Sequence, residues 1–327
     1  MSLVRTALGD TGLDVSRIAY GTWQFSGAWG RLDESMAMDA VACARELGIN
    51  FFDTAQGYGF GVAERLLGQA LRDELRADRS ALVLATKGGV RLDGDRLLRD
   101  GSPEWIRAGI HGSLEALGVD HIDLYQVHWP DPSTPMEQTA EALGQAVDEG
   151  LIGHVGVSNF AVEQMTAFAS VLPVETLQSP YHLFRRAIED EVLTYAQAER
   201  IGVLAYGPLA HGLLGGNMTT STRFAADDWR SQSSAFSGGT FAKNLAVVDE
   251  LREMAMNRGA TISQLAVAWA LSRSGVDVAI VGSTNPDHLR ESAAGAALDL
   301  TPADSEQIEG IIASAEEIIG ASPESYG

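Results

Sequence analysis

The length, composition and charge of the chain exclude several classes of protein. Its 327 residues are enough for one α/β barrel or two ordinary domains, and a hydrophobic fraction of 45% is typical of a folded globular protein. The formal net charge of -21 argues against a general binder of nucleic acid or anionic membranes, because such binding needs a basic face. A single cysteine, Cys43, excludes a disulfide framework and a cysteine-based zinc site, and we interpret it as a small core residue.

The sequence also lacks signals for membrane insertion or export. No apolar run reaches the ~18 residues of a membrane span, and the first residues, MSLVRTALG, lack the apolar core of a signal peptide. We therefore expect a cytoplasmic protein that has neither a membrane nor a nucleic acid as partner.

The chain begins with a predicted β-hairpin, because residues 5–16 carry two turn signals between short apolar stretches. Eight short β-type runs follow, at residues 18–21, 49–54, 81–88, 121–128, 152–159, 176–181, 202–208 and 276–283. Amphipathic stretches typical of helices lie between and after them, at residues 34–47, 62–76, 103–117, 136–149, 162–170, 187–200, 242–273 and 286–295.

Regular alternation of strand and helix predicts a parallel sheet with right-handed crossovers. Eight such units favour a closed (β/α)₈ TIM barrel formed by a single domain over residues 1–327. An open dinucleotide-binding sheet would normally show GxGxxG after its first strand, where this chain has GTWQFSG. An extra C-terminal helix is expected within residues 301–319, and the long loop at 209–240 has the length of a functional lid.

The carboxyl ends of barrel strands carry the chemistry of this fold class, and here they carry complementary groups. The segment 48–59, GINFFDTAQGYG, ends a buried strand in Asp53 and places Tyr58 between two glycines. The next two strands end in Lys87 and His128. Because neighbouring strands lie ~4.8 Å apart, we expect the Asp53 carboxylate to meet the Lys87 ammonium over the barrel mouth.

This set of residues suggests proton transfer by a phenol. A tyrosine titrates near pH ~10 in water, and an ammonium held close to it stabilises the phenolate. Tyr58 can then give a proton to a developing alkoxide or take one from an alcohol. Buried ion pairs are often structural, so the inference depends on the tyrosine beside the pair. No second histidine or carboxylate stands at ligand spacing from His128, so no metal site is expected.

Five motifs in this order resemble the aldo-keto reductase superfamily, in particular its branch of bacterial general-stress and inositol-operon reductases. They are GINFFDTAQGYGFGVAERLLG, LATKGG, DLYQVHWPDP, GVSNF and AYGPLAHGLLGG. The resemblance implies a barrel that binds NADP(H) across its mouth and a catalytic tetrad of Asp53, Tyr58, Lys87 and His128, with Tyr58 as general acid and base. Carbonyls and alcohols would be interconverted by hydride transfer at the nicotinamide.

The resemblance also implies which residues hold the cofactor. Ser158, Asn159 and Gln178 would hold the carboxamide, and Tyr206 would stack on the nicotinamide ring. Further contacts are implied at Gly207, Leu209, Gly282, Ser283, Thr284, His288, Glu291 and Ser292. The family often has Lys or Arg in the 282–288 segment to hold the 2′-phosphate of NADP, whereas here the nearest cation is Arg290. NAD(H) use is therefore a second hypothesis.

We expect Trp23, Phe25, Trp129 and residues of the 209–240 loop to line the substrate pocket, with Phe236 and Phe241 as anchors of the lid. Such an aromatic lining favours apolar or moderately polar carbonyls. Two alternatives stay open. The chain could be a nicotinamide-binding regulatory subunit resembling those of potassium channels, or a barrel hydrolase or isomerase that uses Lys87 as a Schiff-base amine. The sequence predicts neither the physiological substrate nor the oligomeric state.

Overall fold

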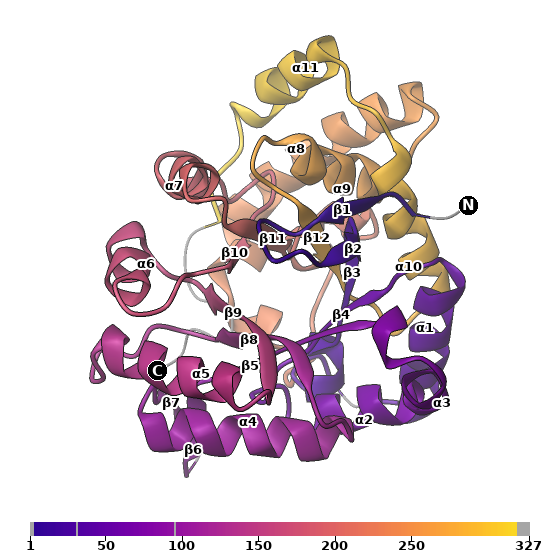
Figure 1. The fold of residues 1–327 in the computed structure, drawn as a ribbon. Coiled ribbons are helices and arrows are strands. Elements are labelled where there is room, and N and C mark those ends of the chain that lie inside the picture. Colours follow the sequence, from indigo (N-terminus) through magenta and orange to yellow (C-terminus); the bar gives the residue numbers. More distant parts are fainter. Residues whose placement is uncertain (1–2, 31, 95, 319–327) are drawn as a thin grey trace.

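A closed barrel of eight parallel strands forms the centre of the molecule (Figure 1). The computed structural model describes residues 3–30, 32–94 and 96–318. Around the barrel the strands follow the order β10-β11-β12-β3-β4-β5-β8-β9, and the pair β9–β10 closes the ring. The barrel strands are β3 (Ile18–Gly21), β4 (Phe51–Asp53), β5 (Val83–Gly88), β8 (Ile122–Val127), β9 (Ile152–Ser158), β10 (Thr176–Pro180), β11 (Gly202–Tyr206) and β12 (Val278–Val281). The predicted (β/α)₈ TIM barrel is confirmed.

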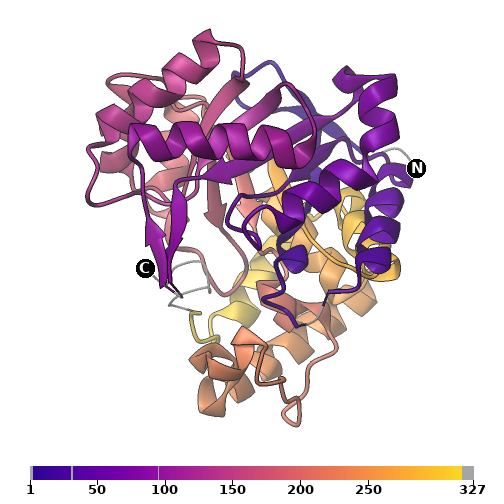
Figure 2. The same ribbon diagram turned by 90° about the horizontal axis from the view of Figure 1, so that it is seen from below.

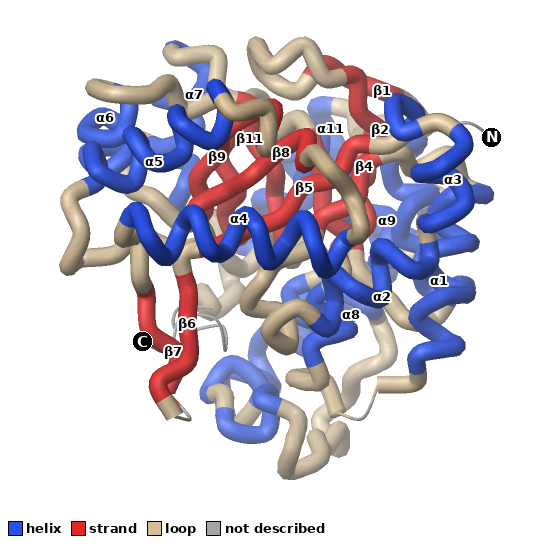
Figure 3. The backbone as a smooth tube through the Cα atoms, turned by 60° about the horizontal axis from the view of Figure 1, so that its bottom comes forward, coloured by secondary structure: helices blue, strands red, loops and turns tan. Residues whose placement is uncertain are grey.

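Helices surround the barrel, as the tube view shows (Figure 3). They are α1 (Glu34–Glu46), α2 (Val62–Ala70), α3 (Arg72–Ala77), α4 (Pro103–Leu117), α5 (Met136–Asp148), α6 (Val162–Ala169), α7 (Val192–Ala198), α8 (Gly238–Asn257), α9 (Ile262–Ser272), α10 (Pro286–Ala293) and α11 (Pro302–Ile312). Within the described ranges, none of the helices is both long and apolar enough to cross a membrane.

Capping explains where several helices begin and end. Helix α4 starts after Ser102, whose side chain accepts from the Trp105 amide, and it ends before Gly118 at a φ of 69°. The predicted helix over 242–273 is two helices, because Thr261 and Gln264 form a capping box that begins α9.

Other predicted helices are shorter than expected. Residues 62–76 divide at Leu71 into α2 and α3, and residues 187–189 form a separate 3₁₀ turn before α7. The C-terminal helix predicted within 301–319 ends at Ile312, and Ile319 lies outside the described residues.

The predicted N-terminal hairpin is present and closes one end of the barrel. Strands β1 (Arg5–Ala7) and β2 (Asp14–Ser16) pair antiparallel, and Leu8 and Val15 pack against the residues that fill the barrel interior. At Gly9, a Cβ atom would come within 2.4 Å of the backbone nitrogen of Gly202, so only glycine allows this close approach. The hairpin therefore closes the barrel at the amino ends of its strands.

A second hairpin was not predicted. Strands β6 (Val90–Asp93) and β7 (Arg96–Arg99) pair antiparallel and project from the body beyond the carboxyl end of β5 (Figure 2). Six of the ten residues from 90 to 99 are charged or glycine, which hides the pattern of two short strands in the sequence.

The barrel interior changes character along its axis. Its middle is apolar and includes Phe51, Ala85, Leu124 and Leu204. Because side chains alternate along a strand, Asp53 and Lys87, two residues beyond Phe51 and Ala85, face the same interior one layer higher. The carboxyl end of the barrel is therefore polar and buried.

Candidate active site

A buried network of charges lies at the carboxyl end of the barrel. Lys87 Nζ donates to Asp53 Oδ2 at 2.7 Å and to the Thr54 carbonyl oxygen at 2.7 Å. Gln178 Nε2 donates to the other carboxylate oxygen, Asp53 Oδ1, at 2.8 Å. The contact between Asp53 and Lys87 that the sequence predicts is present, and Asp53 is also fixed from the opposite side of the barrel. Gln178, which the resemblance assigns to the cofactor, thus orients the carboxylate in this structure.

Tyr58 stands beside this network on a tightly wound loop. Its amide donates to the Ala55 carbonyl oxygen at 3.0 Å. The next three residues, Gly59, Phe60 and Gly61, all have positive φ, and α2 begins directly after them. Lys87 Nζ lies 5.0 Å from the centroid of the Tyr58 ring, and 7% of Tyr58 is exposed. The loop therefore holds the phenol at the site with a small exposed area.

His128 follows β8 and completes the group. Its ring lies edge-on to Tyr58, with centroids 5.7 Å apart. Burial, together with the positive charge of Lys87, holds the pKa of His128 well below its usual range. A neutral imidazole next to the phenol can donate or accept a hydrogen bond without adding a second cation. Its Nδ1 atom is buried and has no partner among the described residues.

Ser158 and Asn159 join three strands at the same end of the barrel. Asn159 Nδ2 donates to Ser158 Oγ at 2.9 Å and to the His128 carbonyl oxygen at 3.1 Å. The Tyr206 hydroxyl donates to Asn159 Oδ1 at 3.0 Å. Asn159 has a φ of 63°, a left-handed conformation that asparagine tolerates better than most residues. The amide therefore fixes the Tyr206 ring relative to His128.

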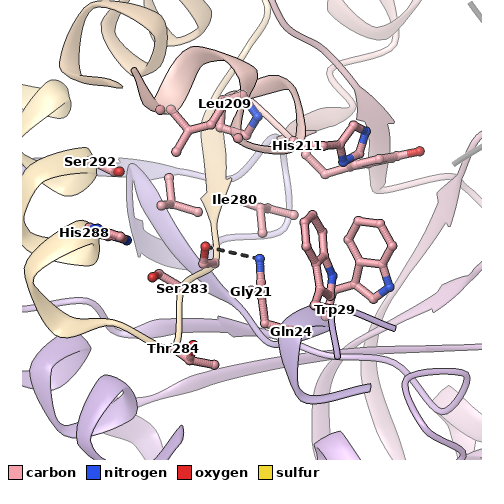
Figure 4. A pocket seen from close by; sticks show the side chains of 18 of the residues that line it. Gly21, Gln24, Trp29, Leu209, His211, Ile280, Ser283, Thr284, His288 and Ser292 are labelled. Carbon is pink, nitrogen blue, oxygen red and sulfur yellow. Dashed lines mark hydrogen bonds between the residues drawn. The ribbon is translucent and has the colours of Figure 1, made fainter. Parts of the chain in front are cut away.

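A pocket of about 570 Å³ is lined by Tyr206 and reaches the N-terminus of α10 (Figure 4). It contains Asp53 and Tyr58 at one end and Ser283, Thr284 and His288 at the other. Most residues assigned to the cofactor line it, namely Gln178, Tyr206, Gly207, Leu209, Gly282, Ser283, Thr284, His288, Glu291 and Ser292. Ser158, Asn159, Lys87 and His128 are not among the lining residues.

Aromatic and histidine side chains form the wall of this pocket beside Tyr206. Trp23 lines the pocket as predicted, and its ring packs edge-on against Trp29 with centroids 4.9 Å apart. Trp29 and His211 were not singled out from the sequence, although His211 belongs to the motif AYGPLAHGLLGG. Burial first, and then the charges of two nearby arginines, lower the pKa of His211 to about 4, so its ring is neutral near pH 7.

The loop at 209–240 lines the pocket as predicted, although its Arg230 was not singled out from the sequence. The Arg230 guanidinium pairs with Asp228 and lies 4.7 Å from the Trp29 ring centroid. A β-bridge between Trp29 and Asp228 joins this loop to the one after β3. The Arg230 guanidinium therefore lines the pocket and is held in place by contacts with residues of both loops.

Two of the expected substrate residues lie elsewhere. Phe25 is buried in the core and packs against Tyr20 at 6.2 Å. Trp129 does not line the pocket, because its ring lies against the Arg99 guanidinium of the β6–β7 hairpin at 4.9 Å. Phe236 and Phe241, the expected lid anchors, pack against each other with ring centroids 6.1 Å apart.

The far end of the pocket is polar and carries negative charge. The Gln24 side chain donates to the Gly282 carbonyl oxygen at 3.2 Å, as Figure 4 shows. Asp33 and Glu291 line this part of the pocket. Arg290, the nearest cation in the sequence, pairs with Glu46 of α1 at 2.9 Å. Among the residues that the structure describes, no three or more His, Cys, Asp or Glu side chains lie close enough together to hold a metal ion.

Comparisons with known proteins agree with this geometry. The model of the Aldo/keto reductase family matches residues 17–313. Aldo-keto reductase YhdN of Bacillus subtilis is 41% identical over 87% of this chain and 86% of its own length. The NADH-specific methylglyoxal reductase of Escherichia coli is 33% identical over 91% of this chain and 94% of its own.

A solved structure extends the likeness to three dimensions. The glycerol dehydrogenase AKR11B4 from Gluconobacter oxydans has a TM-score of 0.88 and 35% identity, with 98% of each chain covered. The family model, the relatives and the barrel therefore agree, and the chain belongs to the aldo/keto reductase family.

Proposed function

We propose that this protein is an oxidoreductase that interconverts a carbonyl and an alcohol with a nicotinamide dinucleotide, and that Tyr58 exchanges the proton. The observation that carries the proposal is that Tyr58 lines the pocket while Lys87 Nζ, held by Asp53, lies 5.0 Å from the centroid of the Tyr58 ring. A solvated surface pair would not orient the ammonium in this way.

The pocket has the chemistry that a dinucleotide needs. Gln24 Oε1 and Trp29 Nε1 belong to lining residues and are buried without a hydrogen-bond partner among the described residues. Arg230 supplies a guanidinium suited to a diphosphate. The α10 N-terminus offers a second favourable place for a phosphate. The residues present fit the cofactor, and Tyr206 would lie against its nicotinamide end.

A bound nicotinamide supplies the hydride chemistry, and the chain supplies the proton. Asp53 and Gln178 keep Lys87 oriented, and the ammonium stabilises negative charge on the Tyr58 oxygen. Tyr58 can then protonate the oxygen of a reduced carbonyl or accept the proton of an alcohol. Neutral His128 lies at the edge of the phenol, where it can orient the substrate oxygen by a hydrogen bond.

We further propose that the protein accepts NAD(H) at least as well as NADP(H). Asp33 and Glu291 line the end of the pocket expected to hold the adenosine, and Arg290 is paired with Glu46 instead of standing free. Carboxylates repel a 2′-phosphate but can accept hydrogen bonds from a ribose diol. The NADH-specific relative from Escherichia coli supports this preference.

The substrate is proposed to be a small uncharged aldehyde, ketone or sugar. Trp23, Trp29 and neutral His211 give an aromatic wall with few ionic groups. Two relatives are named for methylglyoxal and glycerol, which supports a compact substrate. A Schiff-base role for Lys87 is disfavoured, because its ammonium donates to both Asp53 and Thr54.

Tyr58→Phe tests the proposal. Turnover of a panel of aldehydes, ketones and sugars should fall by about 10²–10⁴-fold, the usual contribution of a general acid or base. Dinucleotide affinity, measured by quenching of tryptophan fluorescence, should stay within about twofold because the ring remains. A Tyr58→Phe variant that keeps most of its activity would refute the assignment. Tight dinucleotide binding by the native protein without turnover of any carbonyl would instead favour a regulatory subunit.

A further inference from the structure

A second groove, of about 540 Å³, lies away from the active site, between α2, α3 and the end of α4. Its far wall contains Asp120 and His121, which directly precede β8, and Arg79, which precedes β5. It therefore lies toward the amino ends of the barrel strands, whereas the active site is at their carboxyl ends. Four arginines line this groove, namely Arg65, Arg72, Arg76 and Arg79.

The side chains of three of these arginines have no partner. Within the described ranges, the guanidinium groups of Arg65, Arg72 and Arg76 make no hydrogen bond, ion pair or ring contact. All other described arginines except Arg96 have such a contact, as expected in a chain with 44 acidic and 23 basic residues. Three unpaired guanidiniums in a single groove are therefore an exception to the pattern of this molecule.

The spacing of the three unpaired arginines along the chain places them together. Arg65, Arg72 and Arg76 are separated by seven and four residues, which places them on one face of the α2–α3 segment. Like charges four residues apart destabilise a helix, and these exposed side chains do not contribute to the core. Glu115 and Asp120 on the opposite wall form no ion pair with them. Folding stability does not account for this arrangement, whereas an anionic ligand does.

We propose that the groove binds a small molecule that carries two or more phosphate groups. A guanidinium binds phosphate oxygens through paired hydrogen bonds, and the three unpaired ones can together neutralise several charges. The volume is within the range of about 300–1,000 Å³ for small-molecule sites. Leu75, Leu117 and Val119 also line the groove and can contact an apolar part of the ligand. A concave site of this size suits a small molecule better than a protein surface, which is broader.

The test measures binding of inorganic triphosphate to the whole protein by titration calorimetry, with and without saturating NADH in the active-site pocket. The native protein should bind one triphosphate, and affinity should fall with added salt. Arg72→Gln/Arg76→Gln should weaken binding by at least about tenfold, because two charge-assisted contacts are lost. The matched control, Arg96→Gln/Arg200→Gln, removes two exposed charges outside the groove and should change affinity by less than about twofold.

A second readout separates binding from misfolding. Without ligand, the Arg72→Gln/Arg76→Gln variant should melt at the same temperature as the native protein or higher, because repulsion is relieved. Triphosphate should raise the melting temperature of the native protein and the control but not of the groove variant. Equal weakening in both variants, absence of saturable binding, or displacement of triphosphate by NADH would overturn the proposal. Tighter binding of a polyglutamate peptide than of triphosphate would overturn it in favour of an acidic protein partner.

Discussion

Replacing Lys87 by methionine should destabilise the fold by about 3–5 kcal/mol, the usual effect of leaving one buried charge without its partner. The side chains of Lys87 and Asp53 are only 1% and 3% exposed, so water cannot replace the lost contact. After the substitution, the Asp53 carboxylate loses the ammonium and keeps the hydrogen bond from the neutral Gln178 side chain. Methionine has nearly the length of lysine, so the change removes charge with little change in volume.

The double variant Asp53→Asn/Lys87→Met separates the charge effect from the packing effect. With both charges gone, the fold should regain most of the stability lost in Lys87→Met, and the double-mutant cycle should give a coupling of about 2 kcal/mol or more. Urea unfolding followed by far-ultraviolet circular dichroism gives the free energy of unfolding of the four proteins in the cycle: the native protein, Asp53→Asn, Lys87→Met and the double variant. Turnover should be lost in both variants that lack Lys87, because neither holds an ammonium beside Tyr58. Additive losses of stability in the double variant would refute the reasoning.

Three further predictions concern other parts of the molecule. The hydrogen bond to Glu175 raises the pKa of His154 above its ordinary value near 6.5. The stability that this hydrogen bond contributes is therefore fully present below about pH 6.5 and is lost as the pH rises through the folded-state pKa of His154. Urea unfolding should show this decline between pH 6 and 8.5, and His154→Gln should flatten it. Glu46→Gln removes the carboxylate that pairs with Arg290, so the affinity for NADPH relative to NADH should rise by roughly three- to tenfold; an unchanged ratio of dissociation constants would show that Arg290 does not reach the cofactor. Gly68→Ala places a Cβ atom 2.2 Å from a backbone oxygen at the end of α4 and should destabilise the protein by about 3 kcal/mol; a melting temperature equal to that of the native protein would contradict the close packing of α2 on α4.

The sequence predicts the barrel well because its signals are local and repeated. All eight strand runs overlap the observed strands, and the span of α4 agrees at both ends, since Ser102 and Gly118 are strong capping signals. The division at Thr261 and the hairpin β6–β7 were missed. Both depend on a few neighbouring residues, a capping box in one case and two four-residue strands in the other, and a prediction from hydrophobic periodicity over longer windows does not detect them.

In the candidate site, too, contacts between neighbouring strands could be predicted, whereas contacts between distant parts of the chain could not. The positions of Asp53 and Lys87 follow from strand neighbours, so their contact could be predicted. Gln178 meets Asp53 across the barrel, 125 residues further along the chain, and no local pattern indicates that contact. The position of Trp129 depends on the unpredicted hairpin that covers it.

The barrel closes between its first and last strands, so during synthesis on the ribosome the first strand is made long before its partner. Strand β3 pairs with β12, and Arg17 beside it donates to the Asp277 carbonyl oxygen, 260 residues later in the sequence. At a synthesis rate of about 5–20 residues per second, the open edge of β3 waits on the order of 13–50 s for its partner. A nascent chain stopped before β12 would expose two unpaired apolar edges, on β3 and β11. We expect such truncated chains to aggregate rather than form a smaller folded unit.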